Sequence, residues 1–409
     1  MLTHCTSNHK YSVFTKLVNL VLPLSPILQT YGWGKFDFTF IATCALAVIW
    51  LIFYNGAKYR APKWFSIYLF YYLFVQLISA TNFSSLIPLG WLRIFLVYGL
   101  FFSEIKYPLF IRYYTRIAIV CLLFWAIQYI LFNFVGVKIA GIFPFLPIAL
   151  GVDDVSSYLI WLNGYNSRIC SFFSEPAIFA QFLFPILIAT LFRNQWKYKW
   201  PFICFIVLCL ILLEAGNALV GLIVVIIGYC IWKLRSANAL QKITLIIIIP
   251  VVLCGSGYYY LKTEAATQLL DRQDQLNTDL STVESGESGF IRIYRGYYVY
   301  DALTPFRKIV GANNSELIQE TIDKSPVAHL FMRGDLYFNT IQTVLIRTGI
   351  IGLIIFSIFI GNLFLKTNII GKISLLTLIT LSFIASMYFT ELMFSYIALA
   401  YFNPKRIRR

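Results

Sequence analysis

The sequence predicts an all-α polytopic membrane protein with about twelve transmembrane helices. Of its 409 residues, 59% are hydrophobic and only 12% are charged, whereas a soluble domain carries roughly 25% charged residues. Apolar runs long enough to cross a hydrocarbon core of about 30 Å recur from one end of the chain to the other. The runs do not alternate apolar and polar residues, as strands of a membrane barrel would. The predicted class is therefore a helical bundle in a membrane.

Twelve apolar runs are expected to form these helices. They are separated by polar loops, most of which are short. The last two runs could instead be one long run broken at Glu391. The expected spans cover residues 13–31, 37–56, 64–80, 85–103, 115–135, 172–192, 201–215, 217–233, 243–261, 342–365, 373–389 and 391–403.

The distribution of charge gives this bundle an orientation. Every second loop is rich in Lys and Arg, and the positive-inside rule assigns such loops to the cytoplasm. Both termini are then cytoplasmic, and the net charge of +15 needs no nucleic-acid partner. Of the 18 Asp and Glu residues, 11 lie between Lys262 and Leu336, on the opposite side. The basic loops contain Lys58, Arg60 and Lys63; Lys106, Arg112 and Arg116; Arg193, Lys197 and Lys199; Lys233, Arg235 and Lys242; and Lys366 and Lys372.

Three regions follow from this topology. Residues 1–261 contain the first nine helices and a shorter outer loop at about 137–170. Residues 262–341 form one large outer loop, in which Tyr294–Leu303 is expected to be a short helix. Residues 342–409 contain the last three helices and a basic tail. No internal repeat is visible, which argues against a transporter built from duplicated halves.

Several kinds of chemistry lack the residues that they need. Most of the eight Cys lie inside apolar runs, so a disulfide framework is not expected. The sequence has no His/Cys cluster with metal-ligand spacing, no phosphate-binding glycine loop, no dinucleotide-binding motif and no zinc-protease motif. The acidic pair Asp153–Asp154 has no further ligands nearby and is expected to be a solvated loop. Neither a metal nor a cofactor is predicted.

The first candidate site is the segment Arg168–Ala180, which reads Arg-Ile-Cys-Ser-Phe-Phe-Ser-Glu-Pro-Ala-Ile-Phe-Ala. Arg168 and Glu175 stand at the mouth of an apolar run, where charge is costly unless it faces water, a partner or a cavity. One interpretation is structural: Ser174 would cap a helix, and Glu175 would lie in its first turn, where the helix dipole favours negative charge. The other interpretation is that the two charges belong to a functional site.

The second candidate is a set of basic residues in the large loop: Arg292, Arg295, Arg307, His329 and Arg333. Arginine binds phosphate through two parallel hydrogen bonds and stays charged at any working pH. Such a set beside a bilayer suits a lipid-linked phosphate or diphosphate, although salt bridges within the loop would also explain it. The tight turn Glu214–Asn217 is a third candidate, or simply a turn built on glycine and asparagine.

The first segment resembles the R-x-x-S-x-F-x-E-P-x-x-x-A sequence of Wzy-type bacterial polysaccharide polymerases, which join O-antigen and capsule repeat units. Leu213–Ile223 resembles the turn and helix that follow in these enzymes, with Asn217 in place of their usual Ser or Arg. Arg292–Tyr298, Pro305 and Gly311 resemble the block R-x-x-x-aromatic…P…G-x-G of their large loop, of which the last glycine is missing here. The resemblance covers about residues 160–365.

The resemblance implies a GT-C-like glycosyltransferase in the bacterial inner membrane. Such an enzyme would transfer a growing glycan from undecaprenyl diphosphate to the non-reducing-end sugar of a fresh lipid-linked repeat unit, on the periplasmic face. The donor carries its own diphosphate leaving group, so the reaction is expected to be independent of ATP, nucleotide sugars and metals. Undecaprenyl-diphosphate-linked oligosaccharide and membrane lipid would be its partners, together with a chain-length regulator protein, and no nucleic acid is expected.

The same resemblance implies roles for individual residues. Glu175 would take the proton of the acceptor hydroxyl or orient it, and Arg168 and Arg292 would stabilise the diphosphate as its bond breaks. Arg295 would be a further diphosphate ligand. The expected substrate-binding residues are Arg295, Arg333, Asn217, Glu214, His329 and Asn339. Asn339 stands where the related O-antigen ligases often have His, which favours a polymerase.

Two alternatives stay open. An O-antigen ligase would use the same donor but transfer the glycan to the lipid A core. A flippase for lipid-linked oligosaccharides would need charges deep in a central cavity and no large outer loop. This sequence has its charges at the outer mouth and a long loop, which argues against the flippase.

Overall fold

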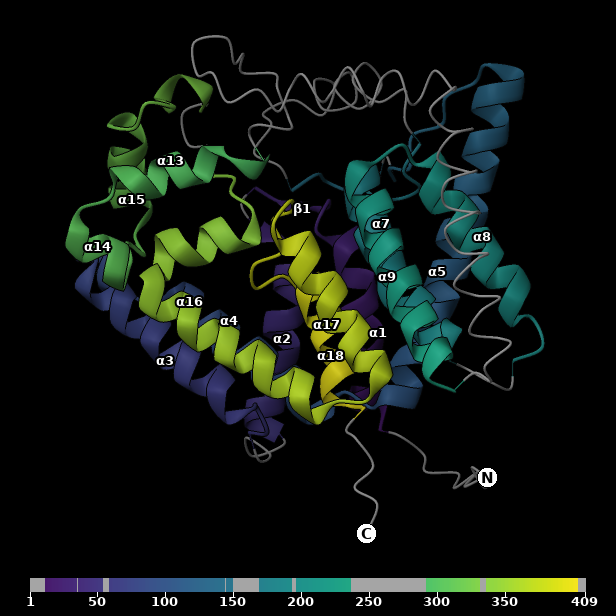
Figure 1. Ribbon diagram of the computed structural model, residues 1–409, viewed down its shortest axis with the longest axis horizontal. Helices are drawn as coiled ribbons and strands as arrows, with labels where there is room; N and C mark the ends of the chain where they lie inside the picture. Colours follow the sequence, from purple (N-terminus) through teal and green to yellow (C-terminus); the bar gives the residue numbers. More distant parts are fainter. Residues whose placement is uncertain are drawn as a thin grey trace.

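The computed structural model describes residues 12–34, 36–53, 59–143, 145–149, 169–192, 196–236, 292–331 and 336–403, and these are mostly helical (Figure 1). Within them, four helices are long and apolar enough to cross a membrane: Ser84–Glu104, Tyr107–Val135, Gly216–Leu234 and Thr340–Lys366. Shorter apolar helices accompany these four. The structure thus confirms a helical chain with candidate membrane spans, but it does not confirm a count of about twelve.

The apolar helices follow the predicted runs. They are α1 (Val13–Leu28), α2 (Phe38–Phe53), α3 (Lys63–Ile78), α4 (Leu89–Glu104), α5 (Tyr107–Ile130), α7 (Pro176–Leu191), α8 (Lys199–Leu212), α9 (Gly216–Ser236), α16 (Thr340–Lys366), α17 (Ile369–Ser382) and α18 (Glu391–Tyr401). A short hairpin of β1 (Gly32–Trp33) and β2 (Phe36–Asp37) joins α1 to α2. The last two runs are separate helices, and Glu391 opens the second. The expected span 243–261 lies outside the described residues.

Contacts at the two ends of the bundle join segments that are distant in the chain. At one end, Asn19 near the start of α1 donates to the carbonyl of Glu104, the last residue of α4, at 3.1 Å. At the other end, the amide of Gly32, just after α1, donates to the carbonyl of Pro147 at 2.9 Å, in the shorter outer loop. These two contacts tie α1 to α4 and to the segment before α7.

Helix α7 is enclosed by the bundle and packs against α5, α8, α9, α17 and α18 (Figure 1). Every residue of α7 except Ile178 is buried. Pro185 has no N–H, so the carbonyl of Gln181 loses its usual helical partner; the Tyr396 hydroxyl donates to this carbonyl at 2.7 Å. A helix so enclosed presents only its ends to a ligand, which directs attention to Glu175 at its start.

The described part of the large loop folds into a small second core. It consists of α13 (Arg295–Ala302), α14 (Pro305–Val310), α15 (Ser315–Asp323) and the 3₁₀ turn η4 (Ala328–Leu330), so the short helix expected at Tyr294–Leu303 is confirmed. Its buried apolar residues are Val299, Leu303, Ala312, Ile318, Ile322, Val327, Leu330, Phe338 and Ile346. Phe338 lies just before α16 and Ile346 in its second turn, so the segment is packed onto the first end of that helix (Figure 1).

The backbones of α14 and α16 cross without side chains between them. Gly349 interrupts α16 with a positive φ of 63°, and Gly311 ends α14 with a φ of 105°. A Cβ atom on Gly349 would overlap the carbonyl of Ile309, and one on Gly311 would overlap the carbonyl of Arg347. Glycine is needed at both positions for its left-handed backbone and for its lack of a side chain. The crossing fixes the segment that contains α13–α15 to α16.

Candidate functional site

Glu175 projects from the first end of α7. It is the N-cap residue, with extended backbone angles (φ −144°, ψ 148°), and its side chain makes no capping hydrogen bond. Pro176 follows as the first helical residue, and a residue before proline is driven into an extended conformation. The prediction that Ser174 caps this helix is therefore wrong, because the cap position falls to Glu175. The side chain of Glu175 is 42% exposed and can meet a partner or a ligand.

The turn before Glu175 is held by polar residues of the same segment. Ser171 has a left-handed φ of 57°. Its amide donates to Oε1 of Gln128 at 2.9 Å, and its hydroxyl donates to a backbone carbonyl of α5 at 2.7 Å. Burial raises the pKa of the neighbouring Cys170 thiol to about 12. A left-handed residue other than glycine costs of order 1–3 kcal/mol, so these contacts must impose the turn that aims Glu175.

Arg292 of the large loop meets Glu175. Its Nη2 atom lies 3.7 Å from Oε2 of Glu175, and the two side chains are 37% and 42% exposed. The start of α16 sets the position of Arg292, because the Asn339 side chain donates to the Arg292 carbonyl at 2.8 Å. An ion pair this open to solvent contributes about 0–1 kcal/mol to stability. The pair therefore adds little to the stability of the fold and is a good candidate for binding or chemistry.

Tyr337 is a third member of this site, and the sequence did not single it out. Desolvation raises the pKa of its phenol; the positive charge of Arg292 acts in the opposite direction, and the negative charge of Glu175 raises it further. The backbone amide of Ser386 also donates to the phenol oxygen. The phenol thus stays neutral at ordinary pH and can donate a proton in a hydrogen bond beside the ion pair. The one sequence signal for it is an aromatic residue two positions before Asn339, the helix cap of α16.

Arg295 does not lie where a diphosphate could reach it. It is only 2% exposed, although the sequence predicts a substrate ligand. Its Nη1 and Nη2 atoms donate to the carbonyls of Leu330 (2.9 Å) and Tyr337 (2.7 Å), and its guanidinium stacks 3.8 Å from the ring centre of Phe331. The structure corrects the prediction: Arg295 joins three segments of the second core and positions Tyr337.

Asn339 also has a structural role and is not accessible to substrate. It is fully buried and forms a capping box with Gln342 at the start of α16. Its Nδ2 atom donates to the carbonyls of Arg292 and Phe383, both at 2.8 Å. The predicted contact with substrate is therefore corrected to a positioning role, since both hydrogens of the amide are used by the chain. Asn339 holds the backbone of Arg292 beside Glu175.

The other predicted residues are spread over the same end of the bundle. Asn217 is 6% exposed and donates to the carbonyl of Ala177 at 3.0 Å, so it ties the start of α9 to the first turn of α7. Its Oδ1 atom has no hydrogen-bond partner among the described residues. Glu214 is exposed in a left-handed turn (φ 50°), and His329 is exposed in η4. Arg168 and Arg333 lie outside the described residues.

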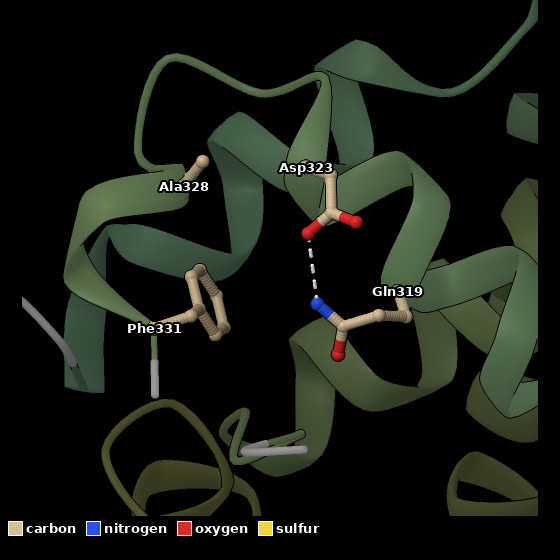
Figure 2. A pocket seen from close by; sticks show the side chains of 4 residues that line it. All are labelled: Gln319, Asp323, Ala328 and Phe331. Carbon is tan, nitrogen blue, oxygen red and sulfur yellow. Dashed lines mark hydrogen bonds between the residues drawn. The ribbon is translucent and has the colours of Figure 1, made fainter. Parts of the chain in front are cut away.

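A cavity of about 370 Å³ opens in the outer segment, lined by Gln319, Asp323, Ala328 and Phe331 (Figure 2). Nε2 of Gln319 donates to Oδ1 of Asp323 at 2.9 Å. In Figure 2 this polar pair lies on one side of the cavity and the Phe331 ring on the other. An amide and a carboxylate opposite an aromatic ring can bind hydroxyls and the apolar face of a small polar ligand such as a sugar. Arg295 links this cavity to Tyr337, because it stacks on Phe331.

Within the described ranges, no three His, Cys, Asp or Glu side chains come together as a metal site. No protein-family model matches the chain, and neither does any curated protein. The functional conclusion therefore depends on the geometry of Glu175, Arg292 and Tyr337 and on the sequence segments that carry them.

Proposed function

We propose that the protein is a polysaccharide polymerase that joins lipid-linked oligosaccharide repeat units by glycosyl transfer. The observation that carries this proposal is the 3.7 Å approach of Arg292, from the large loop, to Glu175, from the segment before α7. Both segments resemble Wzy-type polymerases, and they are distant in the chain. A carboxylate and a guanidinium at one solvent-open point are the groups that glycosyl transfer from a diphosphate requires.

In the proposed reaction, a sugar hydroxyl of the acceptor attacks the anomeric carbon of the donor glycan. The bond from that carbon to the diphosphate oxygen breaks, and undecaprenyl diphosphate leaves with the electron pair. Glu175 takes the hydroxyl proton, and Arg292 stabilises the charge that develops on the diphosphate. The Tyr337 phenol supplies a further neutral hydrogen-bond donor. The product is a longer glycan on the acceptor lipid.

The proposed setting is the periplasmic face of the bacterial inner membrane, with both ends of the chain in the cytoplasm. The ion pair stands at the end of an enclosed apolar helix, where a membrane-held diphosphate and a water-soluble glycan can meet. The cavity beside Phe331 suits a sugar of the glycan. Arg168 and Arg333 stay proposed ligands of the diphosphate, and a chain-length regulator stays a proposed partner.

An O-antigen ligase is the second candidate, because it would use the same donor and the same two charges. The fully buried Asn339 favours the polymerase, since the ligases often have His at this position. A flippase is less favoured. It would need charge deep inside the bundle, whereas every residue of α7 beyond Ile178 is buried and uncharged.

A gene deletion tests the proposal in a cell that makes a long surface polysaccharide. Cells that lack the gene are expected to attach single repeat units in place of a ladder of long chains, and a plasmid copy should restore the ladder. Loss of all surface glycan would favour the ligase. Accumulation of repeat units on the cytoplasmic face would favour the flippase.

A further inference from the structure

Among the described residues, Arg347 is a half-buried cation without an anionic partner. It ends the second turn of α16, and its Nη1 atom donates to Oδ1 of Asn313 at 3.1 Å. No carboxylate among the described residues lies within ion-pair distance of it. Glu316, three residues after Asn313, instead accepts from Asn82 at 3.0 Å. A guanidinium has five N–H donors, and leaving such a charge partly desolvated and unpaired is costly. These contacts favour an anion from outside the chain.

Among the described residues, the groups that contact Arg347 or its partner Asn313 are cationic or neutral. The backbone amide of Asn313 donates to the Ser79 hydroxyl at 3.3 Å, and Arg307 donates to the same hydroxyl at 2.8 Å. Arg307 and Arg347 therefore share one polar cluster. The Tyr388 hydroxyl lies within electrostatic range of Arg347. Guanidinium and hydroxyl donors in this arrangement match the oxygens of a phosphate group. Arg307 itself is used by the chain, because it also donates to a carbonyl at the end of α3 at 3.1 Å.

Apolar surface lies next to this cluster. On α16, the turns after Arg347 carry Ile350 and Ile354, which are 45% and 53% exposed. On α3, which packs against α16, Phe70 and Phe74 are 58% and 53% exposed. A ligand with a phosphate at Arg347 could lay an apolar chain along these helices. This combination of one charged head and a long apolar tail is that of a membrane lipid.

We propose that Arg347 and Asn313 form a second phosphate site, which binds the head of a lipid on the outer end of α3 and α16. It lies apart from Arg292, because Arg347 is seven residues, about 10 Å along the axis of α16, from Thr340, the first residue of that helix. Asn339, directly before Thr340, holds Arg292. If the lipid is a diphosphate, the inference rests on the proposed function, since a polymerase must hold a donor lipid and an acceptor lipid side by side.

Native mass spectrometry on the full chain in phosphatidylcholine nanodiscs tests this site. One arm adds undecaprenyl diphosphate and the other adds phosphatidylglycerol, and the number of lipids retained per protein is counted. The variants are Arg347→Gln, Arg347→Lys and Arg292→Gln. Lys308→Gln is the matched control, because it removes a partly exposed cation of the segment 292–331 that forms an ion pair with exposed Asp301.

Wild type and Lys308→Gln should retain two undecaprenyl diphosphates, and Arg347→Gln and Arg292→Gln one each. Loss of one phosphatidylglycerol in Arg347→Gln, with undecaprenyl diphosphate unchanged, would support the phosphate site and assign it to a phospholipid. Equal retention of both lipids in Arg347→Gln and wild type would overturn the inference. Unchanged retention in Arg292→Gln alone would count against the proposed function and not against this site. If Arg347→Gln does not fold, Asn313→Ala, which keeps the arginine, should weaken retention at this site.

Discussion

The Glu175 carboxylate lies 3.7 Å from the Arg292 guanidinium, and neither side chain is buried. The left-handed turn at Ser171 aims the first group, and the cap residue of α16, Asn339, places the second. Several buried groups thus hold two exposed charges that add little to stability themselves. Such an arrangement is expected where function requires the charges.

The crossing of α14 and α16 should tolerate no side chain. Gly349→Ala must adopt a φ of 63° and place Cβ against the carbonyl of Ile309, which should cost about 1–3 kcal/mol or more. Thermal unfolding in detergent should show a lower midpoint for this variant. Gly361→Ala is the control, since a Cβ there meets nothing within 4 Å and alanine favours a helix. Equal midpoints for the two variants would contradict the crossing.

Asn339 should act through position and not through contact with substrate. Asn339→Ala removes a helix cap and leaves the carbonyls of Arg292 and Phe383 without these donors, at a cost of about 1–3 kcal/mol. Asn339→Ser keeps a capping oxygen, so its thermal stability should lie between that of the wild type and that of Asn339→Ala. A fully stable Asn339→Ala protein that no longer binds undecaprenyl diphosphate would restore the substrate contact predicted from the sequence.

Cys170 should report whether the turn before Glu175 is folded. Its pKa is raised to about 12 by burial, so at pH 8 only about one thiol in ten thousand is a reactive thiolate. Mass spectrometry after N-ethylmaleimide treatment should find Cys170 unmodified in the folded protein and modified in denaturant. Because burial raises the pKa and shields the thiol, protection should persist across neutral pH. Rapid labelling at pH 8 in the folded state would contradict this turn.

The helices could be predicted from the sequence, but the relations between distant segments could not. Apolar runs locate spans because length and composition suffice for them. The cap of α7 is Glu175 and not Ser174, because Pro176 drives the residue before it into the extended conformation of a cap. The sequence around Arg295 predicts a substrate ligand, because neighbouring residues do not distinguish an arginine that binds phosphate from one that donates to backbone carbonyls of distant residues. Tyr337 was missed for the same reason.

The reaction should proceed without added metal, since Arg292 can neutralise charge on the leaving diphosphate. Polymerisation of purified lipid-linked repeat units should therefore be unchanged by EDTA. A pre-dialysed sample with and without magnesium is the control. Activity that EDTA abolishes and magnesium restores would show that Arg292 does not suffice.

The most direct test of the central claim is the rate at which purified protein joins two lipid-linked repeat units. Glu175→Gln is expected to lower this rate roughly 10²–10⁴-fold, because the base is lost. Arg292→Lys should also lower it, because lysine cannot form the two parallel bonds to phosphate. Both variants should keep the wild-type unfolding midpoint, as should Lys308→Gln, which should also keep the rate. Wild-type rates in both Glu175→Gln and Arg292→Lys would contradict the assignment of this ion pair to catalysis.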